Sequence, residues 1–122
     1  MTPATHAFTV VRGTTDPFIF RIKTADPGNP GSFIPMPLTD VRLTIKNGSD
    51  APVTYSLDNG DFVLTNVATG EYTWTPTPAD TRKFKADGKS TYELEVRNGP
   101  TFEMVYLVGT INGIGGLNED AS

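Results

Sequence analysis

The residue types that carry out acid–base chemistry form no catalytic signature in this sequence. Such chemistry usually needs a base that titrates near neutral pH, or two carboxylates held in different environments. The single histidine, His6, lies close to the start of the chain. A nucleophile and an orienting group could be built around it, but a lone histidine in such a position is far more often a surface residue. We therefore expect no catalytic residues and no enzymatic activity.

Two acidic residues and three glycines are the candidates for binding an ion or a phosphate. Asp58 and Asp61 flank an Asn-Gly pair, but they lack the ligand spacing and the distal glutamate of a calcium loop. No helix start follows Gly13, Gly28 or Gly31, so these glycines do not form a phosphate cradle. We expect turn residues here, with no metal, no cofactor and no small-molecule substrate.

Tyr72 and Trp74 could form a platform on which a sugar ring stacks. They are two residues apart in one stretch of extended sequence, so both side chains point to the same side of a strand. A large ring in the middle of a strand normally fills a core. We favour the core position for both rings.

Composition and charge exclude further classes of partner. A net charge of -4, with the basic residues scattered, argues against nucleic acid, because phosphate binding needs clustered Lys and Arg. No apolar run approaches the roughly 20 residues of a membrane helix. The first residues show no charged segment followed by an apolar one, so we see no secretory signal and expect synthesis in a cytoplasm. We expect neither a nucleic acid nor a membrane as partner.

Alternation of apolar and polar residues sets the fold class. It is clearest in 91–96, where Tyr92 and Leu94 share one side and Glu93 and Glu95 the other. Short strands are predicted at 8–11, 18–22, 40–46, 53–57, 62–64, 71–75, 91–96 and 101–110. With Thr77-Pro78 starting a short helical turn, the pattern predicts an all-β, immunoglobulin-like β-sandwich of seven to eight short strands. The sandwich should span 7–111, between a mobile end at 1–6 and a Gly-rich acidic tail at 112–122.

Two strand pairings can be predicted. Arg42 and Lys46 on strand 40–46 would complement Glu93 and Glu95 if strands 40–46 and 91–96 lie side by side and antiparallel. The Asn-Gly pair between 53–57 and 62–64 is a strong signal for a β-hairpin.

Two stretches carry apolar side chains that a core might not absorb. Residues 25–37 contain four prolines, which predicts a long loop whose apolar residues either cover one end of the core or meet a partner. The last strand is apolar on both sides, so it is either central and covered or bears an exposed stripe. The residues that we expect to bind a partner are Phe33, Ile34, Met36, Val105, Leu107, Ile111, Ile114 and Leu117.

The order of these signals resembles the immunoglobulin-like modules of tailed-phage virions, typified by the amino-terminal domain of the baseplate upper protein. The motifs that carry the resemblance are RGTTDPF at 12–18, PLTDVRLTI at 37–45, GEYTWTPTPADT at 70–81 and YELEV at 92–96. The resemblance implies a structural protein of a bacteriophage particle, present in several copies and docked on other virion proteins in the tail, baseplate or neck, or as a capsid decoration. Its location would be the virion. A glycan-binding or adhesion module remains the alternative.

Overall fold

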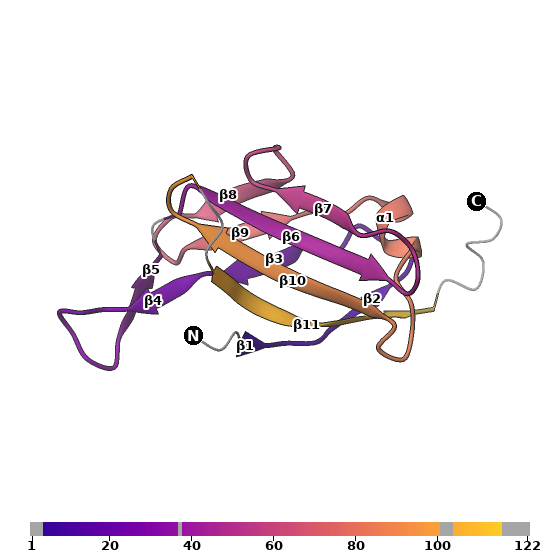
Figure 1. The fold of residues 1–122 in the computed structure, drawn as a ribbon, viewed down its shortest axis with the longest axis horizontal. Coiled ribbons are helices and arrows are strands. Elements are labelled where there is room, and N and C mark those ends of the chain that lie inside the picture. The colour runs from indigo at the N-terminus through magenta and orange to yellow at the C-terminus, as the bar shows by residue number, and fades with distance from the viewer. Residues whose placement is uncertain (1–3, 37, 101–103, 116–122) are drawn as a thin grey trace.

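The computed structural model describes residues 4–36, 38–100 and 104–115, which form a β-sandwich of two facing sheets (Figure 1). The larger sheet has the strand order β1-β11-β10-β6-β7, and β2 also pairs with β11. Its strands are β1 (Ala4–Thr5), β2 (Phe8–Val11), β6 (Asp40–Asn47), β7 (Val53–Ser56), β10 (Ser90–Arg97) and β11 (Met104–Ile114). The all-β sandwich predicted from the sequence is confirmed.

The smaller sheet has the order β3-β9-β8, formed by β3 (Phe18–Arg21), β9 (Glu71–Trp74) and β8 (Phe62–Asn66). Two further strands, β4 (Lys23–Ala25) and β5 (Phe33–Pro35), pair only with each other among the described residues. The single described helix is α1 (Pro78–Arg82). It begins where predicted, because the Thr77 hydroxyl accepts a hydrogen bond from the backbone N–H of Asp80 and the Asp80 carboxylate accepts one from that of Thr77.

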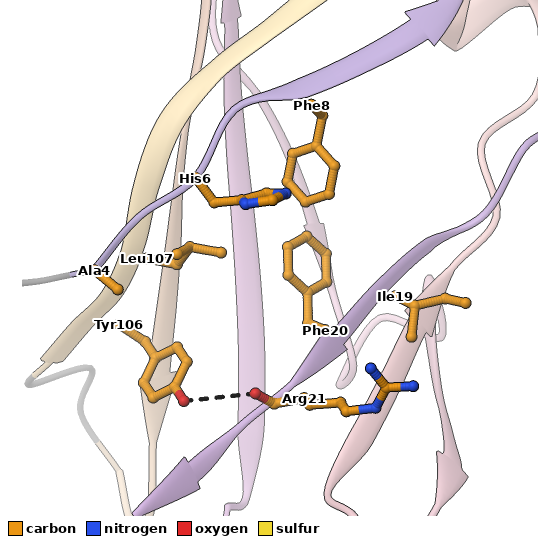
Figure 2. A pocket seen from close by; sticks show the side chains of 8 residues that line it. All are labelled: Ala4, His6, Phe8, Ile19, Phe20, Arg21, Tyr106 and Leu107. Atoms are coloured by element: carbon orange, nitrogen blue, oxygen red, sulfur yellow. Dashed lines mark hydrogen bonds between the residues drawn. The ribbon is translucent and has the colours of Figure 1, made fainter.

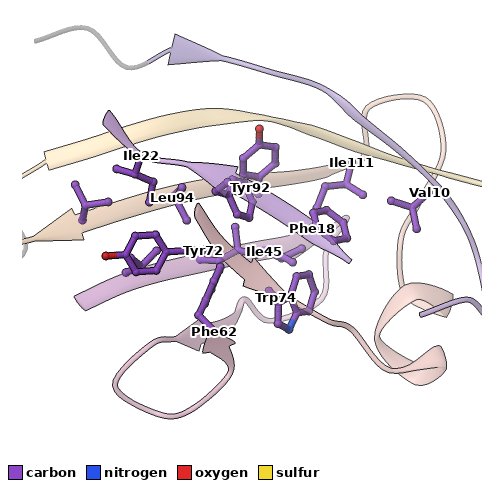
Figure 3. Packing of buried hydrophobic residues seen from close by; sticks show 14 of the residues in the cluster. Val10, Phe18, Ile22, Ile45, Phe62, Tyr72, Trp74, Tyr92, Leu94 and Ile111 are labelled. Carbon is purple, nitrogen blue, oxygen red and sulfur yellow. The ribbon is translucent and has the colours of Figure 1, made fainter. Parts of the chain in front are cut away.

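The core lies between the two sheets and is built from the inward positions of both (Figure 3). The central pair β6–β10 contributes Leu43, Ile45 and Leu94, all fully buried, and the smaller sheet contributes aromatic rings. Rings from opposite sheets touch: Tyr55 and Trp74 have centroids 4.4 Å apart. This interlayer packing fixes the two sheets against each other.

The predicted pairing of strands 40–46 and 91–96 is confirmed. β6 and β10 are antiparallel with Arg42 opposite Glu95, and the Arg42 guanidinium lies 2.9 Å from the Glu95 carboxylate. The register places Lys46 opposite Thr91 and Glu93 opposite Thr44, and the Lys46 ammonium donates to the backbone oxygen of Asp50. Of the expected charge pairs, Arg42–Glu95 therefore forms.

The predicted hairpin around Asn-Gly is wrong. The turn itself forms, since the N–H of Asp61 donates to the oxygen of Ser56 and the Asp61 carboxylate accepts from the N–H of Ser56. Beyond it the strands separate, because β7 pairs with β6 while β8 pairs with β9. The turn connects the two sheets, and each strand finds its pairing partner elsewhere in the chain.

The stretch 25–37 is a second correction. It holds a β-hairpin rather than a long loop, with β5 antiparallel to β4 and a tip closed by a hydrogen bond from the N–H of Asp26 to the backbone oxygen of Ser32. Pro27 and Pro30 lie in the tip, where no ladder hydrogen bond is needed. This hairpin, which we call the arm (residues 23–35), projects beyond the sandwich in Figure 1.

The expected boundaries of the sandwich also shift. Ala4–Thr5 form β1, parallel to β11, and the N–H of His6 donates to the oxygen of Val108, so this part of the expected mobile end is held in the sheet. At the other end β11 runs on to Ile114, because 111–114 pair with β2. The expected tail therefore loses its first three residues to the sheet. Residues 1–3 and 116–122 lie outside the described residues.

Candidate docking surfaces

The residues considered for chemistry are placed apart from one another. His6 is exposed, with its ring edge against Phe8 at a centroid distance of 4.6 Å. The Asp61 carboxylate accepts hydrogen bonds from the N–H of Ser56 and the side chain of Asn59, so it stabilises a turn as predicted. Across the described part of the chain no three His, Cys, Asp or Glu residues gather in a way that could hold a metal ion.

The only tryptophan lies in the core, as the sequence indicated. Trp74 is 2% exposed and Tyr72 is buried beside it on β9. Neither ring is accessible to a sugar. The platform on which the glycan-binding alternative depended does not exist in this fold.

Two tyrosines, the buried Tyr92 and the half-buried Tyr55, act as hydrogen-bond donors. The Tyr92 hydroxyl donates to the backbone oxygen of His6 at 2.6 Å, and that of Tyr55 donates to the Asp80 carboxylate at 2.8 Å. Burial raises the pKa of both phenols well above the usual value, and the Asp80 carboxylate raises that of Tyr55 further. Both phenols stay protonated at neutral pH. They tie elements of the fold together through these hydrogen bonds.

The arm exposes the first two of the predicted contact residues. Phe33 is 66% exposed on β5, and Ile34 beside it is also exposed. The base of the arm is anchored to the turn between β8 and β9, since the N–H of Ile22 donates to the oxygen of Gly70 and the N–H of Met36 to the oxygen of Ile22. An apolar ring is thus presented to solvent by a hairpin with a fixed base.

An apolar hollow of about 290 Å³ lies beside the base of the arm. We call it the arm hollow; it is lined by Pro35, Met36, Leu38, Leu64, Val67, Gly70 and Tyr72. Met36, predicted as a contact residue, is half-buried in its wall. Gly70 leaves space for this arrangement, because its φ is +65° and a Cβ there would lie 2.7 Å from the oxygen of Ile22.

Two contact candidates at this hollow escaped the sequence analysis. Val67 is 72% exposed at the tip of the β8–β9 turn, where the Asn66 side chain accepts from the N–H groups of Ala68 and Thr69. Leu64 is exposed on β8 in phase with the buried Phe62. An aliphatic residue inside a polar turn sequence was the available signal for Val67. No local pattern distinguished Leu64 from a core residue.

A second hollow, of about 330 Å³, separates the edges of the two sheets (Figure 2). We call it the edge groove; it is lined by Ala4, His6, Phe8, Ile19, Phe20, Arg21, Tyr106 and Leu107. The Tyr106 hydroxyl bridges one end of it, accepting from the N–H of Lys23 at 3.1 Å and lying 3.5 Å from the oxygen of Arg21. Leu107, a predicted contact residue, is half-buried in the wall.

The remaining candidates on the last strand divide. Ile111 is 0% exposed and belongs to the core, so its assignment to a partner surface is wrong. The Ile111 side chain points into the core, on the part of β11 that pairs with β2. Val105 is half-buried, whereas Ile114 is exposed next to Val11, its register partner on β2. Leu117 lies outside the described residues.

The predicted contact residues therefore do not form one surface. They fall on the arm with its hollow, on the edge groove and on the carboxyl end of β11. Within the described ranges no helix is long and apolar enough to cross a membrane. The chain matches no protein-family model, and a search of curated proteins gave no match.

Proposed function

We propose that this chain is a non-enzymatic structural protein of a bacteriophage particle, located in the virion. It would be a tail, baseplate or neck component, or a capsid decoration, that docks in several copies on neighbouring virion proteins. The observation that carries the proposal is the arm, which holds Phe33 in solvent at a distance from the core.

The arm and its hollow support docking because they gather apolar side chains that the fold itself does not use. Phe33 and Val67 are both more than half exposed, and Leu64 opens onto the hollow. Aromatic anchors that insert into a desolvated pocket supply much of the energy of protein interfaces. Burial of such surface is worth roughly 25 cal/mol per Å² of apolar area. Burial of Phe33, Leu64 and Val67 against a neighbouring protein would therefore stabilise the complex.

The roles of the tyrosine hydroxyls and of two carboxylates also support a structural function. The hydroxyls of Tyr55 and Tyr92 and the carboxylates of Asp61 and Asp80 are engaged in turns, caps and interstrand ties. Their hydrogen bonds hold the scaffold in shape. A rigid scaffold with a projecting apolar hairpin suits assembly by contact.

The direct test is the protein content of particles. Phage particles released from cells that carry this gene would be purified by density gradient and analysed by quantitative mass spectrometry. We expect the chain in a fixed, multiple copy number relative to the major capsid protein. Abundant chain in the cell lysate with none in the purified particles would contradict the proposal.

A further inference from the structure

The smaller sheet has one edge that is free along the edge groove. β3 pairs with β9 on one side, and within the described ranges no strand pairs with its other side. The N–H of Ile22 donates to the oxygen of Gly70, which continues the β3–β9 register. Because hydrogen-bonded and free positions alternate in an antiparallel ladder, the backbone groups of Ile19 and Arg21 point away from β9. They face the groove.

The free edge corresponds to a strand position that other immunoglobulin sandwiches fill. In the constant-type arrangement the first strand pairs with the second, in the sheet that corresponds to β3-β9-β8 here, and so lies next to the strand equivalent to β3. Here β1 and β2 both pair with β11 of the larger sheet. The place beside β3 is left as a groove floored by Phe8, Phe20 and Leu107 (Figure 2). The Tyr106 hydroxyl occupies one end only.

The charge at this groove is cationic. Of its described lining residues none is a carboxylate, while Arg21 has a side chain 64% exposed. Glu71, on β9, pairs with Arg21 at 3.3 Å, and the exposed remainder of the guanidinium is open to a second carboxylate. A chain of net charge -4 with acidic residues in 118–120 offers one.

We propose that the free edge of β3 binds the carboxyl-terminal segment 115–122 of a second copy of this chain as an added strand. This inference rests on the proposed function, in which copies meet in a particle. In an added strand Leu117 and Asp120 would fall on opposite faces. Leu117 would enter the groove above Phe8 and Phe20, and Asp120 would lie on the outer face beside Arg21. The segment would thus offer an apolar side chain to the apolar floor of the groove and a carboxylate to Arg21 at its rim.

The direction of β11 favours a second copy over the same chain. β11 runs from the groove at Leu107 to Ile114, seven residues or about 23 Å further along, and ends on the side of the molecule away from β1 (Figure 1). The segment after Ile114 therefore starts remote from its own groove. Donation from one copy to the next is a head-to-tail contact, which generates a ring or a filament. Rings and filaments are arrangements in which many copies of one chain can be placed in a virion.

The experiment mixes two full-length chains of which only one is observed. The observed chain is ¹⁵N-labelled and carries Leu117→Ser and Asp120→Asn, so that its own segment is disabled. The unlabelled donor is the unchanged chain, added to about 1 mM, where contacts of short segments become populated. We expect chemical-shift changes confined to β1 and β3, and about tenfold slower hydrogen exchange of the Ile19 and Arg21 amides.

Two variants distinguish the addition of a strand to β3 from nonspecific association of the two chains. Ile19→Pro in the observed chain removes the free N–H without breaking a β3–β9 hydrogen bond, and should abolish the shifts, whereas Ile19→Ala keeps the N–H and should retain them. A donor with Leu117→Ser, which leaves the groove intact, should also abolish them and does not depend on Ile19→Pro folding.

Unchanged spectra at the highest donor concentration would overturn the inference. So would shifts that persist with the Leu117→Ser donor, or concentration-independent protection of Ile19 in the unmodified labelled chain, which would mean that the segment folds back on its own groove. Each of these results leaves open whether purified particles contain the chain, so the proposed function fails or stands by its own test.

Discussion

The central pair β6–β10 and the arm β4–β5 are both antiparallel pairs of strands, but the first has its inward side chains in the core and the second presents apolar side chains to solvent. The central pair has eight residues in register and a neighbour on each side, and its inward positions are fully buried. The arm has three residues in register and leaves Phe33 and Ile34 in solvent. Antiparallel pairing of two strands adds to stability chiefly where their side chains also pack against a second layer.

The largest difference between these regions should appear on truncating an apolar side chain in each. Leu94→Ala leaves a cavity between the sheets and should lower the free energy of unfolding by about 2–5 kcal/mol. Phe33→Ala, the matched change in the arm, removes a ring already in water and should change it by less than about 0.5 kcal/mol. Urea unfolding followed by Trp74 fluorescence measures both. Equal losses would remove the distinction.

Gly70, at the junction of the arm and the sandwich, should give the next largest effect. In Gly70→Ala a Cβ would meet the oxygen of Ile22 in a backbone with φ of +65°, so we expect a loss of about 2–4 kcal/mol. Gly60→Ala is the control, because Gly60 has φ of +85° but open space around it, and should cost about 1 kcal/mol. Similar losses at both sites would show that crowding at the arm's base is unimportant.

Tyr92 extends the central pair towards β1 and should give a smaller, pH-dependent effect. Tyr92→Phe removes the hydrogen bond to His6 and should cost about 1 kcal/mol at neutral pH. Since folding raises the pKa of this phenol, its stabilising contribution is fully present below about pH 10 and is lost as the pH rises further.

The measurement is urea unfolding at a series of pH values from neutral upwards. The unchanged chain should lose stability above about pH 10 more steeply than Tyr92→Phe, which lacks the titrating group. Parallel curves for the two chains would contradict the role given to this phenol.

The smallest effect should come from the outer face of the same central pair. Arg42 and Glu95 form a partly exposed ion pair, and a double-mutant cycle with Arg42→Gln and Glu95→Gln should give a coupling of about 0.5 kcal/mol. The coupling should shrink further in high salt. A coupling several times larger would mean that the outer face stabilises the pair as much as the core does.

The sequence predicted the central region well because alternation there reflects burial on one face. Leu43, Trp74 and Leu94 lie in the core where the two-residue period placed them, and the charges of Arg42 and Glu95 identified neighbouring strands. These features are local or pairwise. They can be read from residue types alone.

The docking regions were harder because their properties depend on distant parts of the chain. Whether 53–57 pairs with 62–64 is decided by competition from β6 and β9, which the Asn-Gly signal does not report. Ile111 and Ile114 lie three positions apart on β11 and so face opposite sides, but because this strand is apolar on both sides the alternation did not show which of them faces the core. Proline content suggested a loop, although Pro27 and Pro30 sit in the tip of a hairpin.

The central claim is that the arm exists for contact and contributes little to folding. Phe33→Ser, expressed alongside the unchanged chain in cells that assemble the particle, tests it in one experiment. The predicted result is an unfolding free energy within about 0.5 kcal/mol of the unchanged chain, with at least a tenfold lower share of the variant in purified particles. Equal incorporation of the two chains, or a loss of stability of the size expected for Leu94→Ala, would contradict the claim.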